Sequence, residues 1–442
     1  MAAALLLLNI GPLVFWTCCA LYLWRLLLAA LPARGQVPEL RPPALPAGTP
    51  GETGSIPATA FSDASFGKSA GCARFVLLIP AHNEELLLGA ALDALHGLDY
   101  PRDAYRVLVI ADNCTDRTAE IARAHGAAVL ERFDTVRIGK GYALETALQA
   151  LLCEPGDDPQ ARRLRALSDF DAVVILDADT VVSPNLLTVF AAGLAAGHKA
   201  MQARYDVLNA GESWRSRLMT CALALAHLVK PLGRERLGLS DGLKGNGMAF
   251  AREVVERVPW SGESITEDIE YTLRLCRAGY RVALTPGATV WAQMPTTGAQ
   301  AVSQRKRWEG GRYRLLVTVA PHLLREGLQR RSRILLDRAL ELIIPPFAEM
   351  FAVPVALFCV CALAAALFGW RSAGWLAWGW AAVLGLQAGY LAGGLWVARV
   401  PARVAAAILR APLYILWKFG VYAVMAVRGS AGGWKRTERR KL

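Results

Sequence analysis

The sequence contains cysteine but lacks every cysteine pattern that would make these residues ligands or cross-links. Its nine cysteines include no Cys-x-x-Cys pair and no spacing typical of a metal site. Four of them lie in apolar segments, at Cys18, Cys19, Cys359 and Cys361, and the others are scattered along the chain. This pattern argues against a thiolate metal centre or a disulfide scaffold and is typical of reduced cytosolic thiols.

The sequence also lacks the glycine-rich loops that hold phosphates in many nucleotide-binding proteins. It has neither the Gly-x-Gly-x-x-Gly fingerprint of a dinucleotide dehydrogenase nor a P-loop. Motifs that stack on bases or read a DNA groove are missing as well. The net charge of +12 is therefore not explained by nucleic acid binding.

Charged residues are scarce in three long stretches. Residues 3–24 contain none and are long enough to cross a bilayer. A cleaved signal peptide is the alternative, but no basic residue precedes this apolar run, which is also longer than a typical signal core. Residues 342–369 and 373–398 are two further candidate spans.

The basic residues are concentrated in the last third of the chain. Residues 301–442 hold 21 Lys and Arg against 6 Asp and Glu, whereas the first 300 residues hold 28 against 31. Basic residues between membrane spans indicate contact with anionic lipid head groups. Those that follow the first span, Arg25, Arg34 and Arg41, predict a multi-pass protein of the cytoplasmic membrane whose middle segment faces the cytoplasm.

A fourth apolar segment, residues 403–427, carries Arg403, Arg410 and Lys418 near one face. If it crossed the membrane it would export a basic tail, so we expect an amphipathic helix on the cytoplasmic surface and three spans, with four as the alternative. The predicted organisation is a span at 1–31, a Pro- and Gly-rich linker at 32–72, a cytoplasmic domain at 73–298, interface helices at 299–341, two spans within 342–400, and an amphipathic helix with a basic tail at 401–442.

Short apolar runs alternate with helical stretches in the cytoplasmic domain. We predict strands at 74–80, 106–111, 127–130 and 172–177, with helices starting near Asn83, Thr115, Gly141 and Pro184. This alternation predicts an α/β fold with a mostly parallel sheet flanked by helices. Ligands of such sheets bind beyond the carboxyl ends of the strands, which directs attention to the polar residues after each run.

Two carboxylates, Asp177 and Asp179, follow the fourth run. Separated by one residue, they project to the same side of an extended chain. They supply the hard oxygen ligands that suit Mg²⁺ or Mn²⁺, which completes its shell with waters and substrate phosphates. A polar loop without a ligand is the structural alternative, but the position at a strand end favours the metal.

Other candidate ligand contacts occupy comparable positions. Asp112 ends the second run, where capping of the next helix is an alternative role. His82 and Glu84 follow the first run, and His82 alone would be typical of a turn. Lys140 opens a helix, where a positive charge opposes the helix dipole. An anionic partner such as a diphosphate would explain it, and simple solvation is the alternative.

Residues 264–275 crowd three acids into the first turn of a helix. Ser264 and Glu267 have the spacing of a capping box, which is a purely structural role. Taken alone, the stretch favours this structural role, and it leaves open whether one of the acids takes a proton from a substrate. A carboxylate at a helix start tends to have a low pKa, so burial or a nearby acid must raise the pKa of Asp268 for it to act as a base.

Residues 303–312 form a basic helix with Gln304, Arg307 and Trp308 on adjoining positions. An Arg there can bind phosphate with two parallel hydrogen bonds, and the Trp face can stack on a sugar ring. An amphipathic helix at the membrane interface is the structural alternative, because Arg and Trp are common there.

The chain resembles the family 2 membrane glycosyltransferases, the group that contains cellulose, chitin and hyaluronan synthases. The resemblance covers about residues 74–315 and is carried by four motifs in order: Asp112, Asp177-x-Asp179, Thr266-Glu267-Asp268 and Gln304-x-x-Arg307-Trp308. One position departs, since His82 stands where the cellulose synthase type has Tyr before Asn-Glu.

The resemblance implies a GT-A type domain and inverting, metal-dependent transfer of a sugar from a nucleotide donor, with a UDP-sugar expected. It implies roles for ten residues: nucleoside binding for His82, Glu84 and Asp112, donor phosphate binding for Lys140, Mg²⁺ or Mn²⁺ binding for Asp177 and Asp179, general base for Asp268, and an acceptor site at Gln304, Arg307 and Trp308.

The acceptor remains open between two possibilities. The Q-x-x-R-W motif favours a growing polysaccharide, whereas the small number of spans favours a single addition to a membrane lipid. A non-catalytic assembly factor is a remote alternative that predicts losses among the metal or base residues, and none is lost. A lipid-binding or transport protein would leave the acidic motifs unexplained. The sequence does not indicate the sugar or the oligomeric state.

Overall fold

The computed structural model describes residues 2–36, 71–152, 164, 166–264, 266–296 and 311–428. The chain divides into two compact units, and each is built from segments that are far apart in the sequence. The helical unit comprises residues 1–37, 210–239 and 313–431, and the sheet unit comprises residues 38–209, 240–312 and 432–442.

The sheet unit contains one eight-stranded sheet in the order β3-β2-β1-β4-β7-β6-β8-β5. The strands are β1 (Phe75–Ala81), β2 (Tyr105–Asp112), β3 (Ala128–Arg132), β4 (Ala172–Ile175), β5 (Val181–Val182), β6 (Ala200–Val207), β7 (Met248–Ala251) and β8 (Val282–Ala292). The four predicted strands are confirmed as β1 to β4. However, β4 ends at Ile175, so Asp177 lies in the turn after it.

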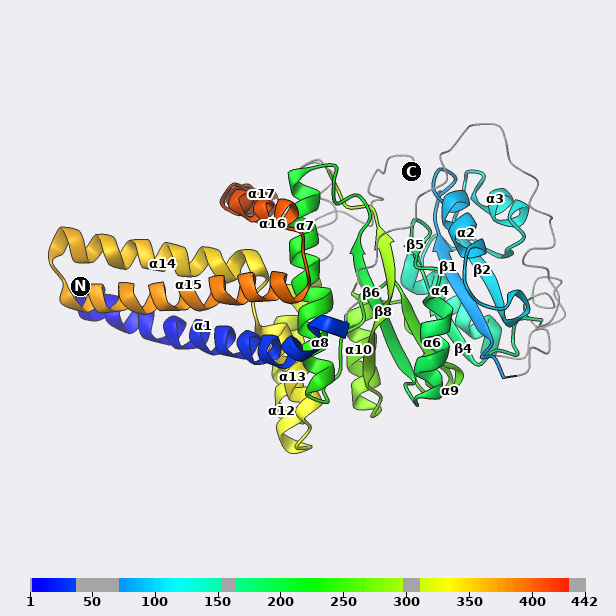
Figure 1. The fold of residues 1–442 in the computed structure, drawn as a ribbon, viewed down its shortest axis with the longest axis horizontal. Coiled ribbons are helices and arrows are strands. Elements are labelled where there is room, and N and C mark those ends of the chain that lie inside the picture. Colours follow the sequence, from blue (N-terminus) through cyan, green and yellow to red (C-terminus); the bar gives the residue numbers. More distant parts are fainter. Residues whose placement is uncertain are drawn as a thin grey trace. The chain divides into compact units, whose positions relative to one another are not determined.

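The strands run in both directions, so the connection that follows β4 and the connection that precedes β7 lie at the same end of the sheet (Figure 1). β1 pairs in parallel with β2 and β4, β2 with β3, and β6 with β8. β7 runs antiparallel to both β4 and β6, and β5 runs antiparallel to β8. Because Ile175 pairs with Met248, the residues that lead into β7 lie beside the turn that follows β4.

Strand β1 and residues 107–111 of β2 are continuous apolar runs, as expected for strands that helices cover on both faces. Val76, Leu78, Leu108 and Ile110 belong to the same buried cluster as the apolar face of α4. The helices of the sheet unit are α2 (Leu88–His96), η2 (Arg102–Ala104), α3 (Thr118–Ala124), α4 (Lys140–Leu152), α6 (Leu186–Ala195), α9 (Arg252–Arg257) and α10 (Glu267–Arg277).

Strands β5 to β8 were not predicted from the sequence. β5 and β7 are too short to show a periodic pattern. β8 contains Pro286 and Gly287, which read as a turn, and its pairing with β6 shifts register between Ala203 and Arg204. The alternation of apolar and polar residues that identifies a strand in a sequence is therefore too short or interrupted in these strands.

The helical unit contains three helices that are long and apolar enough to cross a membrane, among the residues that the structure describes: Ala3–Gln36, Phe347–Phe368 and Arg371–Val397. Its elements are α1 (Ala2–Ala30), η1 (Leu31–Gln36), α7 (Trp214–Leu223), η3 (Ala224–Val229), α8 (Lys230–Arg236), α12 (Ala320–Gln329), α13 (Arg333–Ile343), α14 (Phe347–Phe368), α15 (Arg371–Val397), α16 (Ala402–Ala405), η4 (Ala406–Arg410) and α17 (Ala411–Arg428).

Helix α15 packs against both α1 and α14, and the three lie side by side in Figure 1. Glycine allows close approach: a Cβ on Gly389 would lie 2.9 Å from the ring of Trp24, whose Nε1 donates to the carbonyl of Leu386 at 2.8 Å. Trp380 Nε1 donates to Asn9 Oδ1 at 3.0 Å. Small residues and buried polar pairs are how apolar helices associate when lipid surrounds them.

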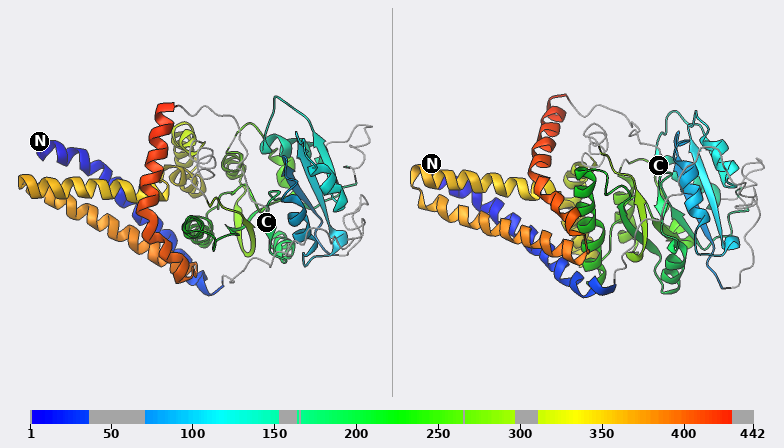
Figure 2. Two further views of the ribbon diagram at one scale, coloured as in Figure 1. Left: turned by 90° about the horizontal axis from the view of Figure 1, so that it is seen from above. Right: turned by 45° about the horizontal axis from the view of Figure 1, so that its top comes forward.

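Helix α17 runs at a steep angle to the three long helices in both views of Figure 2. The preceding turn and the helix expose Leu409, Leu413, Leu416 and Phe419. The spacing of the basic residues predicted that Lys418 shares one face with Arg403 and Arg410. In the structure Lys418 is buried instead, and its Nζ lies 2.8 Å from Glu349 Oε1 of α14. A buried ion pair therefore fastens α17 to α14, with apolar side chains left exposed.

Candidate active site

The predicted acidic residues gather at the carboxyl ends of the parallel strands. Asp112 is the last residue of β2, and Asp177 and Asp179 lie just beyond β4. His82 follows the end of β1, and Lys140 is the first residue of α4. Ligands bind at this edge in open α/β sheets.

The loops after β1 and β2 are joined by side chain to backbone hydrogen bonds. His82 Nδ1 lies 2.7 Å from the carbonyl oxygen of Asp112. Asn83, at a φ of 54°, accepts a hydrogen bond at Oδ1 from the Thr115 N–H at 2.8 Å. The Glu84 N–H donates to Thr118 Oγ1 at 2.8 Å. These contacts bring the first two predicted donor-binding segments together as one surface.

Asp112 forms a buried ion pair that the sequence did not reveal. Arg132, at the end of β3, donates from Nη1 to Asp112 Oδ1 at 2.6 Å, and the two side chains are each 6% exposed. Arg132 also donates to the carbonyl of Arg137 at 2.7 Å and to Asp134 Oδ2 at 3.0 Å. The N–H groups of Arg137 and Val136 lower the pKa of Asp134 to about 2. Arg132 thus orients Asp112 and anchors the loop that leads to α4.

Lys140 lies between the turn that follows β4 and the segment that precedes β7. Its Nζ donates to Asp177 Oδ1 at 2.5 Å and to the carbonyl of Gly245 at 2.5 Å. In the structure Asp177 thus supplies a negative charge beside Lys140. Burial works against the charge on Lys140, but Asp177 and Glu267 outweigh it and raise the pKa of Lys140.

The turn after β4 is held by a residue that precedes β7. Asn246 accepts at Oδ1 from the Asp177 N–H at 3.1 Å and donates from Nδ2 to Thr180 Oγ1 at 2.8 Å. Asn246 is fully buried, and Asp179 is 2% exposed. The two carboxylates thus come from a constrained turn.

The carboxylate of Asp268 and the ammonium of Lys140 both lie beside Gly245, a residue of the segment 240–247. A Cβ placed on Gly245 would lie 3.6 Å from Asp268 Oδ2 and 3.9 Å from Lys140 Nζ. Gly245 has a φ of 78°, a conformation that favours glycine. Because the Lys140 ammonium also contacts Asp177, Asp268 lies in the same site as Asp177.

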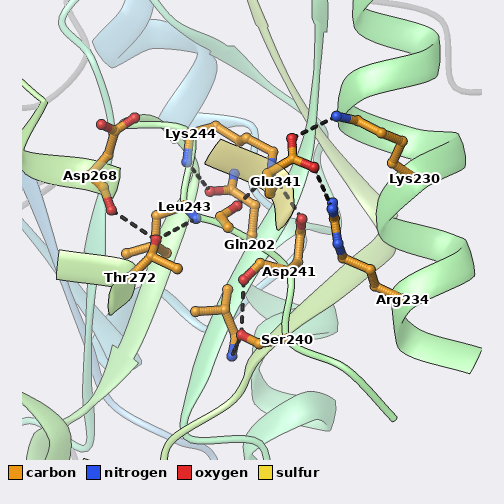
Figure 3. A network of polar contacts seen from close by, with 12 residues as sticks. Gln202, Lys230, Arg234, Ser240, Asp241, Leu243, Lys244, Asp268, Thr272 and Glu341 are labelled. Carbon is orange, nitrogen blue, oxygen red and sulfur yellow. Dashed lines mark hydrogen bonds and ion pairs between the residues drawn. The ribbon is translucent and has the colours of Figure 1, made fainter. Parts of the chain in front are cut away.

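The segment 240–247 is fastened from two sides (Figure 3). Thr272 Oγ1 accepts from the Leu243 N–H at 2.9 Å and donates to the Asp268 carbonyl at 2.8 Å. Gln202, fully buried on β6, accepts from the Lys244 N–H at 2.8 Å and donates to the Asn246 carbonyl at 2.8 Å. These bonds connect β6, the segment 240–247 and α10 as one support for Asp268.

The predicted capping box between Ser264 and Glu267 is wrong. Helix α10 begins at Glu267 with Thr266 before it and no capping side chain. Ser264 Oγ donates instead to Glu270 Oε1 at 2.6 Å. The spacing failed because the helix starts two residues later than a cap at Ser264 would require. Glu267 is consequently not used as a cap.

Glu267 and Asp268 form a pair of carboxyls whose protonation is linked. Burial, and next to it the charge of Asp268, raises the pKa of Glu267 to about 7, against the opposing effect of Lys140. Burial raises the pKa of Asp268 as well, although the Ile269 N–H and Lys140 oppose this. Burial therefore offsets the helix dipole, which the sequence left undecided.

The predicted acceptor residues Gln304, Arg307 and Trp308 lie outside the described residues. The description resumes at Gly311, three residues after Trp308. A Cβ on Gly311 would collide with Cγ2 of Thr266, the residue before Glu267. The chain that continues from this motif thus touches the start of α10.

Sequence reasoning missed Arg132, Gln202, Gly245 and Asn246. The Gly-Asn-Gly turn at 245–247 was a visible signal, because such a turn marks an unusual backbone. Gly247, at a φ of 68°, would place a Cβ 2.7 Å from Val290. Arg132 and Gln202 carried no local signal, since Asp112 and the segment 240–247, which they contact in the site, are distant from them in sequence.

Comparison with known proteins agrees with this arrangement. Residues 73–311 match the family described as Glycosyltransferase like family 2. This chain is 26% identical over 272 residues to the probable glycosyltransferase YdaM of Bacillus subtilis, which covers 59% of this chain and 60% of that protein. It is 29% identical over 243 residues to the beta-monoglucosyldiacylglycerol synthase of a Synechocystis species, covering 54% and 48%. The chain spans about half the length of the curated relatives it matches.

Among solved structures, a mannosyltransferase from Pyrobaculum calidifontis in complex with GDP-Man and Mn²⁺ is similar with a TM-score of 0.50. The two share 19% sequence identity over 89% of this chain and 97% of that chain. Likeness at this identity shows a common fold alone. The predicted fold class, a GT-A type α/β sheet flanked by helices, is confirmed.

Proposed function

Since this chain belongs to the glycosyltransferase like family 2, we propose that it transfers a sugar, with inversion, from a nucleotide-sugar donor to an acceptor at a membrane. The observation that carries the proposal is the position of Lys140, whose ammonium contacts Asp177 and lies beside Gly245 together with Asp268. The ammonium of Lys140 and the carboxylates of Asp177 and Asp268 come from three separate segments and lie close together there. This is the arrangement that a diphosphate leaving group and an acceptor hydroxyl would both require.

The donor side of the proposed site consists of the surface around Asp112 and of Lys140. We assign the nucleoside to Asp112, His82 and Glu84, which the hydrogen bonds between the first two loops hold close together. Lys140 would bind the diphosphate. A UDP-sugar is the donor that the motif resemblance implies.

The cation ligands in this proposal are Asp177 and Asp179. Among the described residues no cluster of three or more His, Cys, Asp or Glu side chains could hold a metal ion. Two carboxylates fit Mg²⁺ or Mn²⁺ when waters and a diphosphate complete the shell. The mannosyltransferase of similar fold was solved with Mn²⁺, which supports this assignment. When bound, the cation would neutralise charge on the leaving diphosphate.

Asp268 would act as the general base. Its carboxylate takes the proton from the acceptor hydroxyl while that oxygen attacks the anomeric carbon. The bond from this carbon to the diphosphate oxygen breaks, and the nucleoside diphosphate leaves with the electron pair. Lys140 stabilises the charge that develops on the leaving group. Gln304, Arg307 and Trp308 are proposed to line the acceptor side.

The acceptor is proposed to be membrane-associated. Three helices among the described residues are long and apolar enough to span a bilayer, and α17 exposes an apolar face that would lie in the membrane surface. The relative named beta-monoglucosyldiacylglycerol synthase favours a single addition to a lipid. The Q-x-x-R-W motif favours a polysaccharide. Product length after incubation with radiolabelled donor separates these two outcomes.

The test of the proposed function is donor binding followed by transfer. Full-length protein in detergent should bind UDP only with Mn²⁺ present, as measured by calorimetry, and Asp179→Asn should remove this dependence. A screen of UDP- and GDP-sugars with membrane lipid should then release nucleoside diphosphate from one donor. The alternative, an assembly factor without catalytic activity, would bind no nucleotide. Absence of any nucleotide binding would therefore reject the proposal.

The raised carboxyl pKa values predict how activity depends on pH. A base must be deprotonated, and burial raises the pKa of Asp268, as it raises the pKa of the neighbouring Glu267 to about 7. We therefore expect kcat/KM to decline at a higher pH than an ordinary carboxyl pKa would give as the pH is lowered, because protonated Asp268 cannot accept the acceptor's proton. Glu267→Gln should move this decline to lower pH, since one repelling charge is removed. A profile that is flat down to about pH 5 would contradict the assignment, because it would indicate an ordinary carboxyl pKa.

A further inference from the structure

Lys140 is held in the candidate site by the backbone on either side of it. Gly139 has a φ of 123°. Gly141 packs backbone to backbone on Gly262, where an added Cβ would lie 2.9 Å from the Gly262 Cα. The Cα of Lys140 is therefore fixed at the carboxyl edge of the sheet. Its side chain is 25% exposed and ends among acidic groups.

The ammonium of Lys140 occupies a position that suits any cation. It lies 2.5 Å from Asp177 Oδ1 and 2.5 Å from the carbonyl oxygen of Gly245. Carboxylate and carbonyl oxygens are also the ligands that hard divalent cations prefer. Two positive groups at one carboxylate oxygen repel each other strongly at such distances. The ammonium and a divalent cation therefore exclude each other at Asp177 Oδ1.

A second position for the ammonium lies close to the first. Asp268 Oδ2 and Lys140 Nζ approach the same side of Gly245, and Glu267 adds a further negative charge there. Lys140 can leave Asp177 and remain beside the carboxyls of α10. Moving the ammonium therefore does not strip it of its counter-charges.

We propose that Lys140 competes with the divalent cation for Asp177, so that the cation binds weakly until the phosphates of the donor draw the ammonium away. This inference rests on the proposed function, because it takes Asp177 and Asp179 as the cation ligands. Linkage then requires the nucleotide and the cation to strengthen each other's binding by the same factor. Lys140 makes the site load the donor and the cation together.

The test is Mn²⁺ binding by the full-length protein in detergent, with free Mn²⁺ measured by electron paramagnetic resonance, with and without UDP. Without UDP, Lys140→Met should bind Mn²⁺ at least about tenfold more tightly than the wild type. UDP should strengthen Mn²⁺ binding by the wild type by a clearly larger factor than in Lys140→Met, where the diphosphate still adds ligands but no ammonium has to be displaced. Lys140→Arg keeps the charge and should remain close to the wild type.

Two outcomes overturn the inference in different ways. Equal Mn²⁺ affinities of the wild type and Lys140→Met without UDP would disprove the competition and leave the cation site itself in place. Mn²⁺ binding that Asp179→Asn does not weaken, in the wild type or in Lys140→Met, would disprove the cation site and the metal-dependent part of the proposed function. Thermal unfolding checks each variant, and Lys140→Gln provides the same comparison if the Met variant is unfolded.

Discussion

Asp268→Asn is expected to lower kcat by about 10²–10⁴-fold, the usual contribution of a general base. Asn has the same shape, and its side-chain oxygen can still accept the Ile269 N–H bond that Asp268 Oδ1 now accepts at 2.8 Å. The bond from Thr272 to the Asp268 carbonyl is also unaffected. The variant should therefore fold and bind UDP with Mn²⁺ like the wild type, with the loss confined to transfer.

Glu270→Gln is the matched control, because it changes an acid in the same helical turn. Glu270 accepts a hydrogen bond from Ser264 Oγ at 2.6 Å, and a Gln oxygen can replace this acceptor. Its activity should stay within about twofold of the wild type. Transfer retained by purified Asp268→Asn would reject Asp268 as the base. An equal loss in both variants would indicate that the helix start, and not the carboxylate, matters.

Arg132→Met should destabilise the sheet unit by about 3–5 kcal/mol, the cost of leaving a buried charge without its partner. Arg132 and Asp112 form an ion pair at 2.6 Å in which each side chain is 6% exposed. The Arg also donates to the carbonyl of Arg137, so the loop before α4 loses an anchor. UDP binding should weaken together with stability. Thermal unfolding and calorimetry of the full-length protein measure the two effects.

The control for this change is Arg123→Met, which breaks a surface ion pair with Glu131 of the same strand. Arg123 and Glu131 are 49% and 39% exposed, and such pairs contribute about 1 kcal/mol or less. Combining Arg132→Met with Asp112→Asn should recover part of the lost stability, because the orphaned charge is also removed. If Arg132→Met and Arg123→Met unfold at the same temperature, Asp112 and Arg132 are not a buried pair.

The acidic motifs could be located from the sequence because they follow strands that are buried on both faces. A run such as residues 107–111 is apolar throughout, so its end is visible, and Asp112 is the next residue. The antiparallel strand β7 could not be recognised in this way. With four residues it shows no period, yet its pairing with β4 carries Gly245 and Asn246 to Asp177.

Local spacing was a poor guide at the start of α10. Ser264 and Glu267 have the separation of a capping box, but Ser264 bonds Glu270. A capping residue is defined by where the helix begins, and the contacts of Thr266 and Tyr271 with other segments decide that. The same is true of Lys418, whose helical spacing predicted a solvated face and whose partner Glu349 lies on another helix.

The class of sheet, the three apolar helices and the acids at strand ends could be recognised from the residues alone, because each depends on neighbours within a few residues. The contacts of Lys140 with Asp177 and of Arg132 with Asp112, and the position of Asp268 beside Gly245, became visible only in the folded chain. Each of these contacts joins segments that are distant along the chain, and charge interactions depend on separation in space and on burial.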